Sequence, residues 1–166
     1  MKKILTLLFI TTLFISCKTE NKTTFPKEAL DNEMLTTNNQ EITFQEIINQ
    51  YKGKTVFIDV WASWCPDCVG GMPKVKALQE NRNDLVYLFI SMDKDYDSWL
   101  KGIEKYNVVG EHYLVSDGMK GVFGKAIELS WIPRYMILDK NGNIALYNVI
   151  EADDAKIEET LKKLAN

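Results

Sequence analysis

The feature that most constrains this chain is an apolar run that ends in two closely spaced cysteines. Residues 56–61 are almost all β-branched, aromatic or otherwise apolar, which is typical of a buried central strand. Cys65 and Cys68 follow with two residues between them, and Pro66 comes directly after the first cysteine. Proline suits the first position of a helix because its missing N–H is not needed there. The sequence therefore predicts a strand-to-helix corner at Cys65.

This placement favours redox chemistry. A helix N-terminus stabilises a thiolate through its unpaired N–H groups, and the thiolate is the species that attacks disulfides. Cys68 lies one helical turn further on, close enough to Cys65 for a disulfide within the first turn. A C-x-x-C pair beside a βαβ pattern predicts a thioredoxin-like redox motif. The alternatives are a structural disulfide or half of a zinc site, for which Cys17 and His112 are the only other cysteine and histidine in the chain.

Strand and helix signals alternate along the rest of the chain. Thr43 and Glu46 form a potential capping box at the start of an amphipathic helix that ends near residue 51. Pro73 is expected to kink the helix that follows Cys65. The remaining expected elements are a strand at 85–92, a helix capped by Asp97 or Ser98 that ends near 106, a short extended piece at 112–115, a short helix at 118–127, two strands at 134–138 and 144–149 joined by an Asn-Gly hairpin, and a final helix at 153–164.

The first 40 residues predict an exported protein. Residues 1–16 have two lysines followed by a short apolar run, as in a secretory signal peptide, and the run is too short for a confident membrane-spanning helix. The junction before Cys17 resembles a bacterial lipobox, which implies cleavage before Cys17 and lipidation of its sulfur, so that the protein is anchored to a membrane rather than spanning it. The alternative is an ordinary signal peptide with an unrelated cysteine. Residues 17–40 are rich in polar side chains and predict a flexible tether, with Phe25-Pro26 and Met34-Leu35 as candidates for docking on the domain.

Several motifs together resemble a known family. They are residues 57–68 with the sequence pattern W-A-x-W-C-x-x-C, Met72-Pro73 in the helix, residues 131–134 (Trp-Ile-Pro-Arg), and the hairpin at 139–144. This set is similar to that of the TlpA/ResA-type thiol–disulfide oxidoreductases of the thioredoxin superfamily. The resemblance runs from about Glu41 to the C-terminus. It implies an α/β thioredoxin fold over residues 41–166, in which a central mixed β-sheet carries helices on both faces.

The resemblance also implies roles at the expected active site. Cys65 is the attacking thiol, and Cys68 is the resolving thiol that breaks the mixed disulfide. Pro133 is expected to be cis and to face the cysteine pair, which exposes the backbone of Ile132 to an extended substrate. For the flanking side chains the expected roles are substrate contacts. Trp64 is an apolar platform beside Cys65, with surface packing as the alternative; Trp131, with core packing as the alternative, and Arg134 are expected to contact the partner.

Two acidic residues are candidates for tuning the chemistry. Asp59 lies in an otherwise apolar strand and is expected to accept the proton of Cys68, with an ion pair to a base such as Lys74 as the alternative. Asp67, after Pro66 in the first turn of the helix, opposes a neighbouring thiolate, which favours a reducing pair; the alternative is an ordinary helix-start residue. The chain departs from the ResA-type pattern at Gly71, where those proteins usually have a glutamate.

These observations predict a thiol–disulfide oxidoreductase that reduces disulfides of exported proteins. The implied partners are disulfide-containing exported proteins and a membrane thiol electron donor, with the domain at the bacterial cell envelope, facing the periplasm or the exterior. We expect a monomer with no metal and no cofactor beyond the Cys65–Cys68 disulfide. The formal net charge of −3 and the lack of a basic patch make nucleic acid an unexpected partner. The alternatives are a dithiol oxidase that forms disulfides and a non-catalytic binding lipoprotein.

Overall fold

The apolar run at 56–61 forms the central strand of the molecule. The structure, a computed structural model, describes residues 22–165. Strand β3 (Val56–Trp61) is buried at all six positions. It pairs in parallel with β4 (Val86–Ser91) and antiparallel with β6 (Arg134–Leu138). A central strand that is covered on both faces needs apolar side chains at successive positions, which explains why the pattern in β3 is continuous rather than alternating.

The other strands extend the sheet on both sides of this centre. They are β1 (Glu33–Thr36), β2 (Glu41–Thr43), β5 (Glu111–Leu114) and β7 (Ile144–Val149), and the strand order is β2-β1-β5-β4-β3-β6-β7. Strands β3, β4 and β5 run parallel to one another, and the β1–β2, β1–β5 and β6–β7 pairs are antiparallel. The mixed sheet predicted from the sequence is therefore confirmed.

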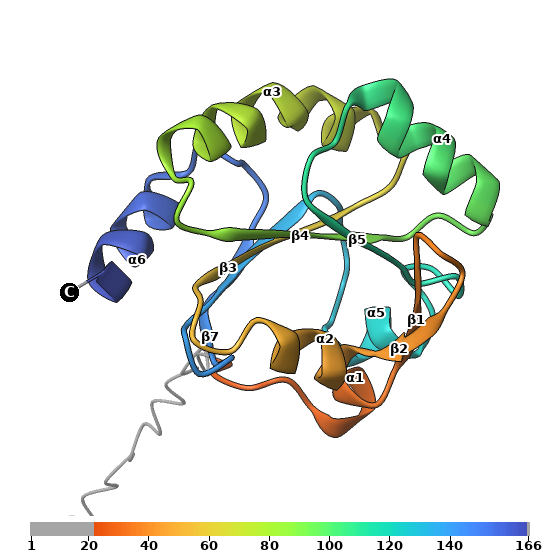
Figure 1. The fold of residues 1–166 in the computed structure, drawn as a ribbon, viewed down its shortest axis with the longest axis horizontal. Helices are drawn as coiled ribbons and strands as arrows, with labels where there is room; N and C mark the ends of the chain where they lie inside the picture. Colours follow the sequence, from red (N-terminus) through yellow and green to blue (C-terminus); the bar gives the residue numbers. More distant parts are fainter. Residues whose placement is uncertain (1–21, 166) are drawn as a thin grey trace, which may run out of the picture.

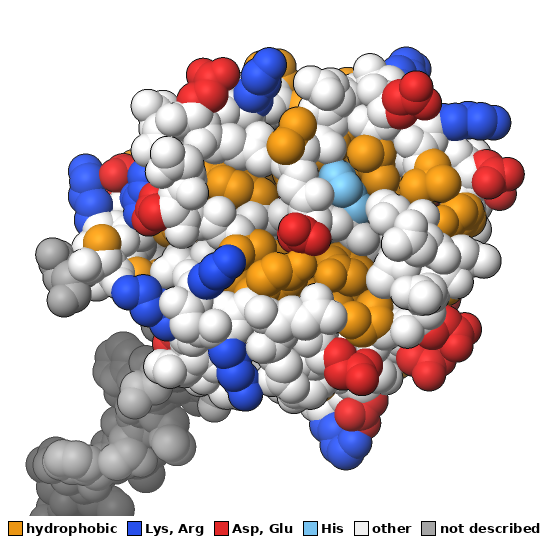
Figure 2. Space-filling view, in the orientation of Figure 1, with side chains coloured by type: hydrophobic (Ala, Val, Ile, Leu, Met, Phe, Trp, Pro, Cys, Tyr) orange, Lys and Arg blue, Asp and Glu red, His pale blue; other side chains and the backbone are white. Residues whose placement is uncertain are grey.

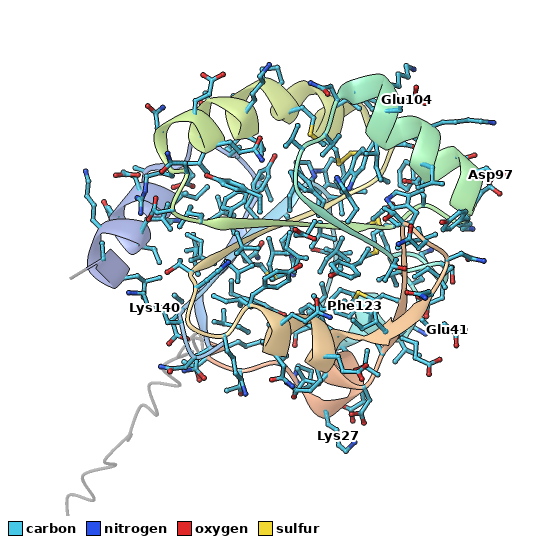
Figure 3. The ribbon with its side chains drawn as sticks, in the orientation of Figure 1. Lys27, Glu41, Asp97, Glu104, Phe123 and Lys140 are labelled. Atoms are coloured by element: carbon cyan, nitrogen blue, oxygen red, sulfur yellow. A yellow bond between two sulfur atoms is a disulfide. The ribbon has the colours of Figure 1, made fainter. Side chains whose placement is uncertain are left out.

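Helices cover both faces of the sheet (Figure 1). One face carries α3 (Pro66–Asn81) and α4 (Tyr96–Tyr106), and an ion pair between Arg82 and Glu158 joins the end of α3 to α6 (Ala155–Ala165). The opposite face carries α1 (Lys27–Leu30), α2 (Phe44–Gln50) and α5 (Val122–Ala126). In Figure 3, Phe123 of α5 points into the layer beneath the sheet, where its ring packs edge-on against Phe44 at 5.0 Å. The predicted thioredoxin-type layering is confirmed.

The helix caps agree with the local sequence signals at one helix and differ at another. The capping box of α2 is present, with the Glu46 backbone N–H donating to the Thr43 hydroxyl and the Glu46 carboxylate accepting from the Thr43 backbone N–H. The predicted cap of α4 at Asp97 or Ser98 is wrong. Asp95 is the cap, and its carboxylate accepts the Ser98 backbone N–H at 2.7 Å. Three acidic residues lie close together here. The sequence therefore predicts that the helix has a capping residue but does not identify which residue it is.

The part of the predicted tether that the structure describes is folded onto the domain. Residues 22–40 contain α1 and β1, and β1 pairs with both β2 and β5. Phe25, Ala29 and Met34 are buried, and the Phe25 ring packs edge-on against Phe44 at 4.9 Å. A free tether is therefore wrong for these residues, and the docking expected for Phe25 and Met34 is confirmed. The composition of the segment is polar, but its few apolar side chains are spaced so that they enter the core.

Hydrophobic side chains also reach the surface of the domain. Figure 2 shows them gathered in a band across the middle of one face, between the layer of α3 and α4 and the layer of α1 and α2.

Among residues 22–165, no helix is both long enough and apolar enough to cross a membrane. The predicted signal peptide (1–16), the predicted lipidation site at Cys17 and residues 18–21 lie outside the described residues.

Candidate active site

The strand-to-helix corner predicted at Cys65 is present at the end of β3. Cys65 is the N-cap of α3, Pro66 is its first residue, and the Cys68 backbone N–H donates to Cys65 Sγ at 3.1 Å. The two cysteines form a disulfide, with their Cα atoms 5.3 Å apart. Both are largely buried, Cys65 at 5% exposure and Cys68 at 1%. The first cysteine is thus the more accessible of the two, and it lies where backbone N–H groups stabilise a sulfur anion.

The loop before β6 faces this corner. The Ile132–Pro133 peptide bond is cis, as predicted. The carbonyl oxygen of Ile132 lies 3.7 Å from Cys65 Sγ, although 67 residues separate the two in the chain. The side chain of Ile132 is buried, so the part of this residue that meets the cysteine pair is its backbone. The arrangement places an extended peptide segment directly beside the sulfur that a disulfide partner would approach.

Two exposed tryptophans lie near the cysteine pair, each in the wall of a different cavity. Trp64 is 59% exposed and Trp131 is 57% exposed, so the core-packing alternative for Trp131 is wrong. Trp64 lines a cavity of about 500 Å³ that also includes Met92, Asp93 and Lys120. Trp131 lines a second cavity of about 380 Å³, which we name the cis-proline cavity; its walls include Pro66, Asp67, Gly71, Lys74, Pro133 and Tyr135. Large exposed aromatic side chains beside a reactive centre are typical of a protein contact surface.

Asp59 is buried beneath the helix that carries the cysteines. Its side chain is 1% exposed, and Oδ1 has no hydrogen-bond partner among the described residues. Burial raises the pKa of Asp59 from 3.8 to about 8, because the charged form loses its hydration. Lys74, the alternative ion-pair partner, instead bridges Glu151 at 2.8 Å and Asp153 at 3.0 Å. An unpaired buried carboxyl of this kind is suited to exchange a proton near neutral pH.

Arg134 does not contact a partner as expected from the sequence. Its side chain is buried, Nη1 donates to the Ile127 carbonyl at 2.8 Å, and Nη2 donates to the Glu128 carbonyl at 3.1 Å. The guanidinium group also lies 5.6 Å from the centre of the Tyr147 ring. Both carbonyls belong to the turn that precedes Trp131, so Arg134 holds the cis-proline loop in place from beneath. The planar guanidinium can bridge two neighbouring carbonyls in a way that a single ammonium cannot.

Asp93 belongs to a charged stretch, residues 93–97, whose composition favours a solvated loop, but the structure buries this residue. It is 2% exposed, and its carboxylate accepts the Ser63 backbone N–H at 2.9 Å and the Ser63 hydroxyl at 2.7 Å. It also accepts the Ser91 hydroxyl at 2.7 Å. Ser63 immediately precedes Trp64, so Asp93 fixes the turn that leads to the cysteines. The signal available in the sequence was its position directly after β4, at the same edge of the sheet as Cys65.

Asp67 and His112 are the remaining residues considered from the sequence. Asp67 is exposed in the first turn of α3, on the same cavity wall as Pro66. His112 stacks on Phe89 at 5.3 Å, and its Nε2 lies 3.0 Å from the Val108 carbonyl oxygen. Within residues 22–165, no three His, Cys, Asp or Glu side chains cluster as a metal site would require.

The comparison with known proteins identifies the family. The model of a family described as thioredoxin-like matches residues 53–144, which is more than half of the chain and includes the cysteine pair, Asp59 and the cis-proline loop. The chain belongs to the thioredoxin-like family. Membership agrees with the sheet order, the position of the disulfide at the start of α3 and the cis-proline opposite it.

Individual relatives of this thioredoxin-like chain carry related names. It is 28% identical over 116 residues to the thiol:disulfide interchange protein DsbE of Vibrio cholerae, covering 69% of this chain and 60% of that protein. It is 26% identical over 119 residues to the thiol-disulfide oxidoreductase ResA of Bacillus thuringiensis, covering 70% and 67%. A solution structure of a Bacteroides vulgatus protein, described as a thiol-disulfide oxidoreductase, matches with a TM-score of 0.67 and 29% identity, over 80% of this chain and 85% of that one. The chain spans about half to two thirds of the length of the curated relatives it matches.

Proposed function

We propose that this protein is a thiol–disulfide oxidoreductase that reduces disulfides of exported proteins through Cys65 and Cys68. The observation that carries the proposal is the pairing of the Cys65–Cys68 disulfide at the start of α3 with the Ile132 carbonyl and the cis Pro133 opposite it. Cys65 attacks the substrate disulfide and forms a mixed disulfide. Cys68 then attacks Cys65 Sγ, which forms the intramolecular disulfide and releases the substrate as a dithiol. Two electrons pass from the protein to the substrate.

The neighbouring side chains support this sequence of steps. Asp59 accepts the proton of Cys68, whose burial disfavours the thiolate. Trp64, Trp131 and the backbone of Ile132 contact the partner as an apolar surface and an extended edge. The carboxylate of Asp67 and the position of Pro66 tune the pair toward reduction, because a nearby negative charge disfavours the thiolate. The protein works as a monomer with no metal or cofactor, and a membrane thiol donor reduces it again after each turnover.

Reduction of insulin disulfides tests the activity, and the reduction potential tests its direction. We expect turnover by the wild type and none by Cys65→Ser, with Cys68→Ala retaining trapped mixed disulfides on Cys65. A potential of about −270 mV is typical of reducing pairs, whereas about −120 mV is typical of a strong oxidant. A strongly oxidising value would replace the reductase with a dithiol oxidase. Absence of any exchange would instead favour a binding lipoprotein with a static disulfide.

We also propose that the mature protein is anchored to a membrane of the bacterial cell envelope through lipidated Cys17, with the domain facing the periplasm or the exterior. Support comes from the charged and apolar leader at 1–16 and the lipobox-like junction. Mass spectrometry of the membrane fraction tests this directly. A lipidated peptide beginning at Cys17 is the expected result, and an unmodified product in the soluble fraction would contradict it.

A further inference from the structure

Tyr147 of β7 is a half-buried tyrosine to which the steps above give no role. Its hydroxyl donates to the Ile127 carbonyl oxygen at 2.5 Å. Two cations lie against its ring, the Arg134 guanidinium at 5.6 Å and the Lys22 ammonium at 5.3 Å from the ring centre. Because the face of an aromatic ring attracts cations, Tyr147 joins the N-terminal segment to the start of β6.

The β6–β7 pairing is irregular at this tyrosine. Tyr135 pairs with Val149 and Ile137 pairs with Leu146, so two steps along β6 match three steps along β7. The extra residue lies between Leu146 and Val149, which is the interval that contains Tyr147. An inserted residue of this kind re-aims a neighbouring side chain, and here the tyrosine hydroxyl reaches a carbonyl at the C-terminal end of α5.

The contacts of Tyr147 and of its two cations converge on the turn formed by Ile127 and Glu128. The Ile127 carbonyl accepts from both the Tyr147 hydroxyl and Arg134 Nη1. The Glu128 carbonyl accepts from Arg134 Nη2 at 3.1 Å, and its carboxylate pairs with the Lys22 ammonium at 2.5 Å. Glu128 has a φ of 51°, a left-handed conformation that is uncommon for residues other than glycine, asparagine and aspartate. The surrounding side chains therefore hold the turn in a shape that its own residues do not favour.

This turn is the base of the loop that meets the substrate in the proposed function. The loop spans residues 128–133 and ends in the cis-proline. Arg134 follows it and pairs with Val60 of β3, while its side chain returns to carbonyls six and seven positions earlier in the chain. The loop is thus closed at its base by hydrogen bonds, and it places the Ile132 carbonyl 3.7 Å from Cys65 Sγ. A loop that is held in one conformation loses less freedom when a partner binds.

We propose that Tyr147 is a positioning residue for substrate docking: with Arg134 it clamps the base of the loop at residues 128–133, and Lys22 of the N-terminal segment completes the clamp. The inference rests on the proposed oxidoreductase function and adds the groups that preorganise its docking site. The clamp acts on substrate binding, because its hydrogen bonds go to the base of the loop rather than to the cysteine pair. An extended partner that pairs with the Ile132 backbone needs the loop in one conformation, whereas a small disulfide that reaches only the sulfur does not.

Steady-state reduction of two substrates by the full-length protein tests the proposal, with dithiothreitol as the electron donor. Insulin is a polypeptide that can pair with the loop backbone, and hydroxyethyl disulfide is too small to do so. Tyr147→Phe keeps the ring and removes one hydrogen bond, so we expect the KM for insulin to rise about threefold to tenfold with kcat unchanged. Arg134→Lys, which can replace only one of the two guanidinium hydrogen bonds, should raise the same KM by a similar factor. The reaction with hydroxyethyl disulfide should not show this effect.

Matched variants separate the clamp from a general loss of stability. Tyr87→Phe also removes a tyrosine hydroxyl that donates to a backbone carbonyl, that of Arg82 at 3.0 Å, and it should leave the KM for insulin unchanged. Lys22→Ala should raise this KM by about twofold, because an exposed ion pair contributes little. Lys27→Ala, which removes another exposed ion pair near the N-terminus, should leave it unchanged.

The two substrates together decide the outcome. If Tyr147→Phe leaves the KM for insulin unchanged, or impairs the reactions with both substrates equally, Tyr147 does not position the loop. If the wild type reduces neither substrate, the proposed oxidoreductase function is wrong, and the docking role is wrong with it.

Discussion

At the scale of single residues, the clearest consequence of the structure concerns Asp59. Its carboxyl is buried beside apolar side chains and has a pKa of about 8 in the folded protein, against 3.8 in an unfolded chain. Between these two values the unfolded chain gives up a proton that folded Asp59 keeps, so the free energy of unfolding falls as the pH rises. The stabilising contribution is complete below about pH 4 and is lost as the pH rises through about 8, at up to ~1.4 kcal/mol per pH unit.

Asp59→Asn should therefore have two separate effects. In the oxidised protein, where the two cysteines cannot titrate, the variant should lose the decline in stability between pH 5 and pH 8, and urea unfolding measures this. In the reduced protein, disulfide reduction near neutral pH should slow by about 10² or more, while alkylation of Cys65 continues at the wild-type rate. Wild-type turnover by the variant from mildly acidic to neutral pH would show that Asp59 is not the proton acceptor.

At the scale of elements, the corner that carries the cysteines depends on close packing of α4. A Cβ atom added to Gly102 of α4 would lie 2.4 Å from Ser63 Cβ, so the helix backbone approaches the turn before Trp64 as closely as glycine allows. Asp93 holds the same turn from the end of β4 through its hydrogen bonds to Ser63. The geometry of the cysteine corner is thus set by two elements that lie downstream of it in the chain.

Gly102→Ala should destabilise the protein although alanine is the better helix former. The added methyl group must push α4 away from Ser63, and overpacking of this kind costs about 1–3 kcal/mol. Gly70→Ala in α3 meets open space and should instead stabilise by about 0.5–1 kcal/mol through helix propensity. Urea unfolding of both oxidised variants makes the comparison. Equal stabilisation by the two substitutions would show that α4 does not press on the turn.

Predictions made from residue patterns alone succeeded where the signal is local, whereas the long-range contact of the Ile132 backbone with Cys65 was predicted only through the family resemblance. The capping box of α2, the Asn-Gly hairpin and the proline after Cys65 each involve residues within a few positions of one another, and all were predicted. Burial of Arg134 and Asp93 depends on carbonyl and hydroxyl groups that only the folded chain brings near them. The hydrogen bond from Tyr147 to the Ile127 carbonyl spans 20 positions, and a single sequence contains no signal for it.

At the scale of the whole molecule, the N-terminal segment determines how far the domain can lie from its proposed anchor. The Ile144 backbone N–H donates to the Thr23 carbonyl at 2.8 Å and the Lys22 ammonium pairs with Glu128, so the chain is attached to the domain at residues 22 and 23. Thr23 is six positions after Cys17, and even a fully extended chain of that length spans only about 20 Å. A lipidated Cys17 would therefore hold the domain close to the membrane surface, within reach of the proposed membrane electron donor.

Phe25→Ala tests whether this segment is an integral part of the domain. The ring is 6% exposed and packs on Phe44, so its removal leaves a cavity between α1 and α2 and should lower the free energy of unfolding by about 3 kcal/mol. Lys27→Ala, two positions further on, removes only an exposed ion pair with Asp31 and should change stability by less than about 0.5 kcal/mol. Urea unfolding of both oxidised variants provides the measurement. If Phe25→Ala is as stable as Lys27→Ala, the segment behaves as a tether in solution, and the 20 Å limit on the reach of the domain no longer applies.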